Sequence, residues 1–366
     1  MDEVERARTG ISFRGIQADA YFAVRLLRHL NGAGSVGGAL ALVMAPWWST
    51  YLHESRRVLG KRLPQLVTPM SKEASAVFEH ARHGVKMFLD SKRNIGAYEA
   101  YFDDIAAVHR ERFLSTVNPW LRPLAKDLGV TTYESQPILT THGAAFATGL
   151  EPMALLDKNM GTRLRSLWEE GGQSFAMAAL AVDGPPPLIV QGWDLRSVKS
   201  NDVVASNYYG SVFAGSSFMA FNAVLLHYLG MVNTAHLMFP MLFDLESDEY
   251  AIFKMRYLVT THVAGSLAKL AESGRHEFAK GSASALRDVV EGLPHPSALK
   301  RVWLRNLLVH YEPHAKADVG KFDRERLLGG IIAMADVPED VDELVEQTNG
   351  NLAHLAASLN AWMAAP

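Results

Sequence analysis

The sequence contains no cysteine, and this absence removes several kinds of chemistry at once. Disulfide bonds, thiol nucleophiles and zinc or iron–sulfur sites held by cysteine are all excluded. A chain without cysteine suits a reducing compartment, and residues 1–10 mix charges without the apolar core of a secretory signal. Both features predict a cytoplasmic protein.

A strong excess of charge is missing as well, because the 366 residues carry a formal net charge of only −3. Without a basic excess, no whole face of the protein is expected to attract nucleic acid, so any such contact must be local, at a cleft. The GxxxxGK[ST], GxSxG and HExxH signatures of nucleotide-binding proteins, hydrolases and zinc proteases are also absent. The function must therefore be sought in a less common pattern.

One long segment lacks charge altogether. Residues 203–243 contain no Asp, Glu, Lys or Arg, and this run is long enough to span a bilayer. Clusters of basic residues are missing from its flanks, however, although they usually border a membrane span. Several polar groups in one span are also expensive in lipid, and this segment contains Asn222, His227, Asn233, Thr234 and His236. We therefore predict a buried core helix or helix pair, and no membrane partner.

The composition that remains is typical of a globular protein, with 48% hydrophobic and 20% charged residues. Apolar residues recur at helical spacing in residues 1–130 and 206–366, whereas residues 131–205 are richer in strand and turn signals. We predict a mostly α protein with a helical N-terminal region, a mixed middle segment and a C-terminal multi-helix bundle. A small central β-hairpin or sheet is expected around residues 174–194, with its turn at Asp183-Gly184-Pro185-Pro186.

Several helix boundaries can also be predicted. Ser71 and Ser247 are the expected N-caps of helices that follow them. A further helix is expected from Ile95 to Phe113. The C-terminal end is expected to form two helices, over residues 337–347 and 351–363, separated by Thr348-Asn349-Gly350.

The stretch LKRVWLRNLLVHYEPH, from Leu299 to His314, combines helical spacing with unusual polar residues. On a helix, one stripe facing the bundle would consist of Leu304, Leu307, Leu308 and Tyr311. A second face would carry Arg301, Arg305, Asn306 and His310, with Val302, Trp303 and Val309 among them. A polar face studded with large apolar side chains is typical of a surface that another helix or subunit covers, with polar groups kept at a cleft.

Residues 305–310, Arg-Asn-Leu-Leu-Val-His, resemble the Arg-polar-x3-His motif of the HEPN superfamily. These are helical-bundle domains of many prokaryotic toxins and phage-defence ribonucleases. The resemblance covers the C-terminal portion, residues 206–366, and the other Arg…His pair, Arg256 and His262, fits less well because Tyr257 follows the arginine. It implies a HEPN-like bundle with metal-independent endoribonuclease activity and no cofactor. The 2′-hydroxyl of RNA would attack the adjacent phosphate and leave a 2′,3′-cyclic phosphate.

The resemblance also implies a role for each motif residue. His310 would be the acid/base or phosphate-positioning group. Arg305 would bind the phosphate and stabilise its developing charge, and Asn306 would orient the histidine or bind phosphate. In the family two motifs usually meet across a homodimer interface. The protein would then be a toxin or antiviral-defence effector, whose residues 1–205 sense, regulate or bind a partner such as an antitoxin.

Two other interpretations remain open. Arg305, Asn306 and His310 could make ordinary helix–helix contacts, in which case the bundle is a non-catalytic interaction or scaffold module. Asp104 and Glu111, seven residues apart on one expected helix, could instead bind a divalent metal in a metal-dependent enzyme. A solvated helix face is the simpler explanation of these two carboxylates.

Overall fold

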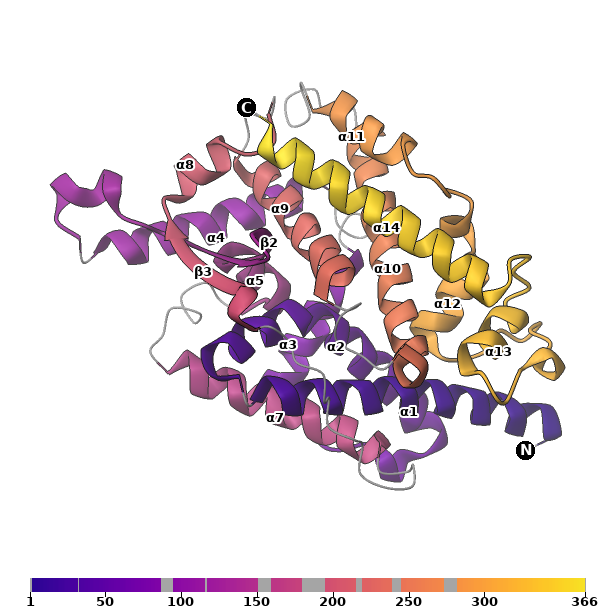
Figure 1. Cartoon of the computed structure of the whole chain (residues 1–366). Helices are drawn as coiled ribbons and strands as arrows, with labels where there is room; N and C mark the ends of the chain where they lie inside the picture. The colour runs from indigo at the N-terminus through magenta and orange to yellow at the C-terminus, as the bar shows by residue number, and fades with distance from the viewer. Residues whose placement is uncertain are drawn as a thin grey trace.

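The computed structural model describes residues 2–31, 33–86, 95–115, 117–150, 159–179, 195–214, 219–238, 245–272 and 282–365. It confirms the expectation of a mostly α protein with one small sheet (Figure 1). Buried side chains from the N-terminal, middle and C-terminal regions belong to one hydrophobic core.

Long helices build the N-terminal part of the molecule. They are α1 (Glu3–Asn31), α2 (Gly34–Arg62), α3 (Lys72–Lys86), α4 (Ile95–Ser115) and α7 (Met160–Ala179), with 3₁₀ turns at Pro64–Leu66 and Pro119–Leu124. The Ser71 hydroxyl accepts a hydrogen bond from the backbone N–H of Ala74 at 3.1 Å, as an N-cap does. The predicted helix from Ile95 is also present, and it extends two residues beyond Phe113.

A GxGxxG spacing at residues 32–37 has a structural explanation. Such glycines bind a dinucleotide only when they follow a strand, and here helix α1 precedes them. A Cβ on Gly37 would lie 2.0 Å from the carbonyl oxygen of Leu30. The glycine is therefore needed where the start of α2 passes close to the end of α1.

The sheet does not lie at the position around residues 174–194 that the sequence predicted. Strands β1 (Leu128–Tyr133) and β2 (Gln136–Thr140) form an antiparallel hairpin, and β3 (Val198–Val203) pairs antiparallel with the other side of β1. Glu134 and Ser135 both have positive φ, as the type I′ turn of a two-residue hairpin requires. Residues 174–179 belong to α7, so the hairpin predicted around 174–194 is wrong for these residues; 180–194 lie outside the described residues.

The charge-free segment supplies a central core helix, as predicted. Helix α9 (Met219–Asn233) continues as a short π-helix over Thr234–Met238, and nearly all of its side chains are buried. Backbone carbonyls accept hydrogen bonds from two of its amide side chains: the Asn222 amide donates to Tyr209 at 2.7 Å, and that of Asn233 donates to Pro137 at 2.9 Å. Gly230 lets the helix approach β2, since a Cβ there would lie 2.6 Å from the Ile138 oxygen. Among the described helices, none combines the length and the apolar character needed to cross a membrane.

The C-terminal part is a set of packed helices around α9 and α10 (Figure 1). Its elements are α10 (Leu245–Glu272), α11 (Ala283–Glu291), α12 (Val302–His310), α13 (Leu327–Met334) and α14 (Val341–Ala364), while the short α5 (Thr141–Thr148) and α8 (Ala205–Gly210) flank the sheet. Because α10 begins at Leu245, the expectation that Ser247 is its N-cap is wrong.

The expected break at Asn349-Gly350 is also wrong, since α14 is one continuous helix through these residues. Tertiary contacts hold this part of the helix. Asn349 accepts a hydrogen bond from Arg256 of α10 at 2.8 Å, and Asn351 exchanges two hydrogen bonds with the backbone of His295, at 2.7 and 2.9 Å. Packing therefore overrides the weak helix propensity of Asn and Gly.

Two buried ion pairs join α1 to α10. The Lys254 ammonium lies 2.5 Å from a carboxylate oxygen of Asp19, and both side chains are excluded from solvent. Three tyrosine rings surround the ammonium, with Tyr311 the nearest at 3.8 Å from the ring centroid. A second buried pair links Arg25 to Asp248. Charges buried in this way fix the relative positions of the elements that carry them, because separating either pair would leave an unpaired charge in the core.

Candidate active site

A pocket of about 800 Å³ opens beside α12, on the side of the helix that faces the C-terminal half of α2. Its wall combines three parts of the chain: α2, α12 with the segment that follows it, and the end of α13. The residues that line it are Glu54, Arg57, Trp303, Asn306, Leu307, His310, Glu312, Pro313, His314, Lys316, Ala317, Met334, Ala335 and Asp336. Two of the three predicted motif residues, Asn306 and His310, are among them.

His310 is held by a carboxylate from α2. Its ring nitrogen Nδ1 lies 2.8 Å from Oε2 of Glu54, 256 residues away in the sequence. The Glu54 side chain is buried, whereas 41% of the His310 side chain is exposed. A carboxylate can only accept a hydrogen bond, so Nδ1 carries the proton and Nε2 of the neutral ring is left with a lone pair. His310 is therefore arranged as a proton acceptor.

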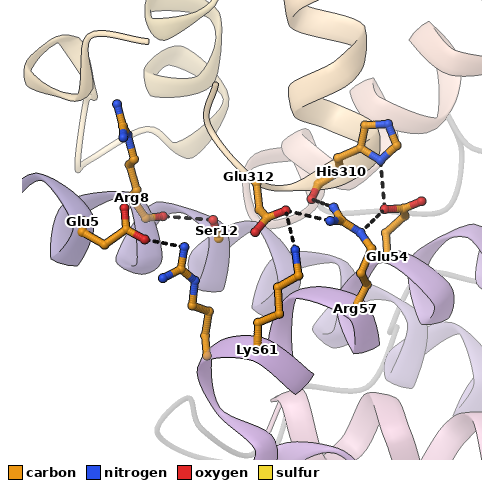
Figure 2. Close-up of polar contacts among 9 residues, drawn as sticks. Glu5, Arg8, Ser12, Glu54, Arg57, Lys61, His310 and Glu312 are labelled. Atoms are coloured by element: carbon orange, nitrogen blue, oxygen red, sulfur yellow. Dashed lines mark hydrogen bonds and ion pairs between the residues drawn. The ribbon is translucent and has the colours of Figure 1, made fainter. Parts of the chain in front are cut away.

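Arg57 organises the carboxylates at this side of the pocket (Figure 2). Its guanidinium contacts Glu54 at 3.1 Å, Glu312 at 2.8 Å and the carbonyl oxygen of His310 at 3.3 Å. Lys61 lies one turn further along α2, at 3.9 Å from Glu312. Since Arg57 contacts both carboxylates and the backbone after α12, it ties α2 to the end of the motif helix.

These contacts set the ionisation of Glu54. Burial alone would raise the pKa of its carboxyl group, but the hydrogen bonds and charges of His310 and Arg57 outweigh burial and lower the pKa to about 2. Glu54 is thus a carboxylate over the whole physiological range. The negative charge beside His310 stabilises the protonated ring that would form when His310 takes up a proton.

The lowered pKa of Glu54 predicts a loss of stability in acid. The ordinary value is 4.5, so its contribution is fully present above about pH 4.5 and is lost as the pH falls towards 2. The difference is worth on the order of 3 kcal/mol, at about 1.4 kcal/mol for each pH unit. Denaturant unfolding at pH 6 and pH 3 should show a larger loss for the wild type than for Glu54→Gln. Equal losses in the two proteins would contradict this assignment.

Arg305 occupies a different position from the one that the motif predicted. Its Nε and Nη2 donate to Oδ1 of Asn306, at 3.3 and 3.0 Å, and Arg305 is not among the residues that line the pocket. A guanidinium only donates hydrogen bonds, so the Asn306 oxygen must face Arg305 and its amide nitrogen is left to donate elsewhere. Within one chain, Arg305 orients Asn306 rather than reaching the pocket itself.

The end of α12 is fixed by an unusual backbone conformation. Tyr311 has a φ of 59°, in the left-handed region, and its N–H closes the helix onto Leu307 at 3.0 Å. Its hydroxyl donates to the buried carboxylate of Asp19 at 2.5 Å. Four residues further on, the carbonyl oxygen of Ala315 accepts a hydrogen bond from Arg8 of α1 at 2.5 Å. The segment after His310 is thus anchored at two points to the N-terminal helix.

The predicted faces of the motif helix agree with the structure in part. Leu304, Leu307, Leu308 and Tyr311 are buried, as expected. Within this chain no described helix covers Val302 and Trp303, which are exposed. The helix is shorter than the stretch from Leu299 to Glu312, and Val309 is buried rather than placed on the polar face. The reason is that α2, α10 and α13 all pack against α12, so its C-terminal turn is covered on more than one side.

The alternative metal site gains no support from the geometry of the described residues. Asp104 and Glu111 are exposed on α4, and His109 beside them is buried with its ring 5.0 Å from that of His142. Nowhere in the described part of the chain do three or more His, Asp or Glu side chains come together as metal ligands would.

The chain matches no protein-family model, no curated protein and no solved structure. The function must therefore be argued from the pocket itself.

The sequence did not point to Glu54 and Arg57, the two residues of α2 that contact His310 and Glu312 at the pocket. A partial signal existed, because Glu54, Arg57 and Lys61 are spaced three and four residues apart and share one face of α2. That pattern is also the pattern of a solvated helix. Only the tertiary structure places these residues against His310 and Glu312.

Proposed function

We propose that the pocket beside α12 is the active site of a metal-independent endoribonuclease in which His310 is the acid/base group. The observation that carries this proposal is the hydrogen bond between Glu54 and His310 at the pocket wall. A histidine oriented by a carboxylate is the arrangement that general-base catalysis uses to accept a proton from a hydroxyl group. The resemblance of residues 305–310 to the HEPN motif supports the choice of RNA as the substrate.

The proposed reaction uses the atoms that the pocket offers. Nε2 of His310 accepts the proton of the RNA 2′-hydroxyl while the 2′-oxygen attacks the neighbouring phosphorus. The bond from phosphorus to the 5′-oxygen breaks, the 5′-oxygen takes up a proton from water, and a 2′,3′-cyclic phosphate remains. The proton held by His310 then returns to solvent. The Asn306 amide donates to a phosphate oxygen, which places a donor where negative charge develops.

Homodimerisation is part of the proposal. Arg305 does not line the pocket of its own chain, so a phosphate contact by this residue requires a second copy whose Arg301–His310 face lies at or beside a two-fold axis. The exposed Val302 beside this face supports such a contact, whereas the neighbouring Trp303 lines the pocket. Residues 1–205 would then sense, regulate or bind a partner such as an antitoxin, in a toxin or antiviral-defence effector.

Incubation of purified protein with RNA tests the proposal directly. We expect cleavage that persists in EDTA and products that end in 2′,3′-cyclic phosphate, because His310 and not a metal ion supplies the acid/base group. Mass spectrometry of the fragments identifies that end group. Cleavage that EDTA abolishes would contradict the proposal and favour the metal-dependent alternative at Asp104 and Glu111.

A non-catalytic interaction module is the second candidate, and one observation favours it. The 3₁₀ turn at Pro119–Leu124 presents Trp120, with 90% of its surface exposed, together with Leu121 and Leu124. Large exposed apolar side chains on neighbouring positions are typical of protein contact sites. If no RNA is cut even when candidate regulators are added, the interaction module explains the protein better than the ribonuclease does.

A further inference from the structure

Two aromatic rings, those of Trp303 and His314, contact each other at the wall of the pocket. The ring centroids of Trp303 and His314 lie 4.2 Å apart with 55° between the ring planes, and both residues line the pocket. The backbone N–H of Lys316 donates to Nδ1 of His314 at 3.1 Å, which fixes the orientation of that ring. Trp303 nevertheless keeps 52% of its surface exposed. A tryptophan held in place but left open to solvent is available to a ligand in the pocket.

The charges around Trp303 and His314 favour an anionic ligand. Glu54 is paired with Arg57, Glu312 is paired with both Arg57 and Lys61, and Asp336 is paired with Lys321 at 3.1 Å. The three carboxylates that line the pocket therefore each have a cationic partner. Lys316, on the same wall, makes no ion pair with the described residues. Its ammonium and the amide of Asn306 remain as donors for a negatively charged group.

We propose that Trp303 and His314 form a subsite for an unpaired nucleobase, next to a phosphate position at Asn306 and Lys316. This inference rests on the proposed ribonuclease function and names the part of the RNA that the pocket recognises. Every base has a flat π-face that stacks on an exposed aromatic ring, and a flanking phosphate would meet the free donors. Bases inside a duplex are already stacked on one another, so the subsite selects single-stranded RNA.

Binding can be measured without cleavage in a His310→Ala background. Fluorescence anisotropy of a labelled 12-nucleotide single-stranded RNA should show that Trp303→Ala weakens binding by about 5- to 100-fold, the size of one stacked base. Trp303→Phe should retain most of the affinity, because phenylalanine keeps an aromatic face. The parent protein should bind the same sequence as a duplex more weakly than as a single strand. Neither Trp303 substitution should change the affinity for the duplex much.

Trp120→Ala is the matched control. It removes another exposed tryptophan, on a turn that does not line the pocket, and should leave RNA affinity unchanged. Uridine 5′-monophosphate tests whether the subsite binds a free nucleotide or a base within an RNA chain. It should bind far more weakly than the oligonucleotide. A free nucleotide that binds as tightly as the RNA would overturn the assignment to a polymer.

Four further outcomes decide the inference. Equal RNA affinity of Trp303→Ala and its parent would overturn it, and so would a Trp303→Ala protein that changes from dimer to monomer in light scattering, since Trp303 would then be a subunit contact. If the wild type binds single-stranded RNA through Trp303 but never cuts it, the subsite stands and the ribonuclease proposal fails. If the wild type cuts RNA with a KM that Trp303→Ala does not change, the ribonuclease proposal stands and the subsite fails.

Discussion

Replacement of His310 by alanine is expected to slow RNA cleavage by about 10²- to 10⁴-fold, which is the usual contribution of a general acid or base. The variant should stay folded, because the buried residues Leu304, Leu307 and Leu308 still anchor α12. Single-turnover cleavage of a labelled RNA measures the loss. His295→Ala is the matched control, since it removes another half-buried histidine that does not line the pocket. A His310→Ala protein with unchanged cleavage would remove the basis of the proposed mechanism.

Substitutions of the neighbouring residues separate direct from indirect roles. Glu54→Gln should also slow cleavage, because the amide no longer stabilises the protonated ring of His310. Arg305→Ala and Asn306→Ala should each cost up to about 10²- to 10³-fold, as the loss of a transition-state contact does. If Arg305 acts only by orienting Asn306, the double variant should be no slower than Asn306→Ala. Additive losses would instead indicate that Arg305 contacts the phosphate itself.

The second large effect concerns stability. Lys254→Met should lower the free energy of unfolding by about 3–5 kcal/mol, because it leaves the buried carboxylate of Asp19 without its cation. The hydroxyl of Tyr311 remains its single described hydrogen-bond partner. Burial acts against both charges of the pair, raising the pKa of Asp19 and lowering that of Lys254, so neither charge is tolerated there alone.

Denaturant unfolding with two comparison proteins tests this expectation. Lys321→Met removes one partner of the exposed Lys321–Asp336 pair and should cost less than about 1 kcal/mol. The double variant Asp19→Leu/Lys254→Met removes both buried charges and should recover much of the stability that Lys254→Met loses. If Lys254→Met is as mild as Lys321→Met, then the buried pair does not hold α1 against α10.

The central core helix could be predicted because its polar residues argue against lipid. Asn222 and Asn233 lie within a segment without charge, and each needs hydrogen-bond partners that a bilayer cannot provide. In the structure, carbonyl oxygens from neighbouring segments accept those hydrogen bonds. Which carbonyls do so could not be predicted, since Pro137 lies 96 residues from Asn233 in the chain.

The sheet and the last helix show where local patterns fail. Residues 131–205 carried strand signals, but β3 joins β1 through pairs such as Val130 with Asn201, which depend on the folding of the chain between them. Asn349 and Gly350 carried a stop signal, but contacts with α10 and with the segment before α12 keep α14 helical. In both cases the decisive partner is distant in sequence.

The sequence by itself determined the absence of thiol chemistry, the predominance of helices, the Ser71 cap and the buried stripe of the motif helix, because each depends on composition or on residues within a few positions of one another. The tertiary structure alone decided the arrangement of the pocket. It set His310 against Glu54, 256 residues away, and turned Arg305 towards Asn306 instead of the pocket. Helical spacing says which side chains share a face, whereas only the packing of α2 against α12 decides what that face meets.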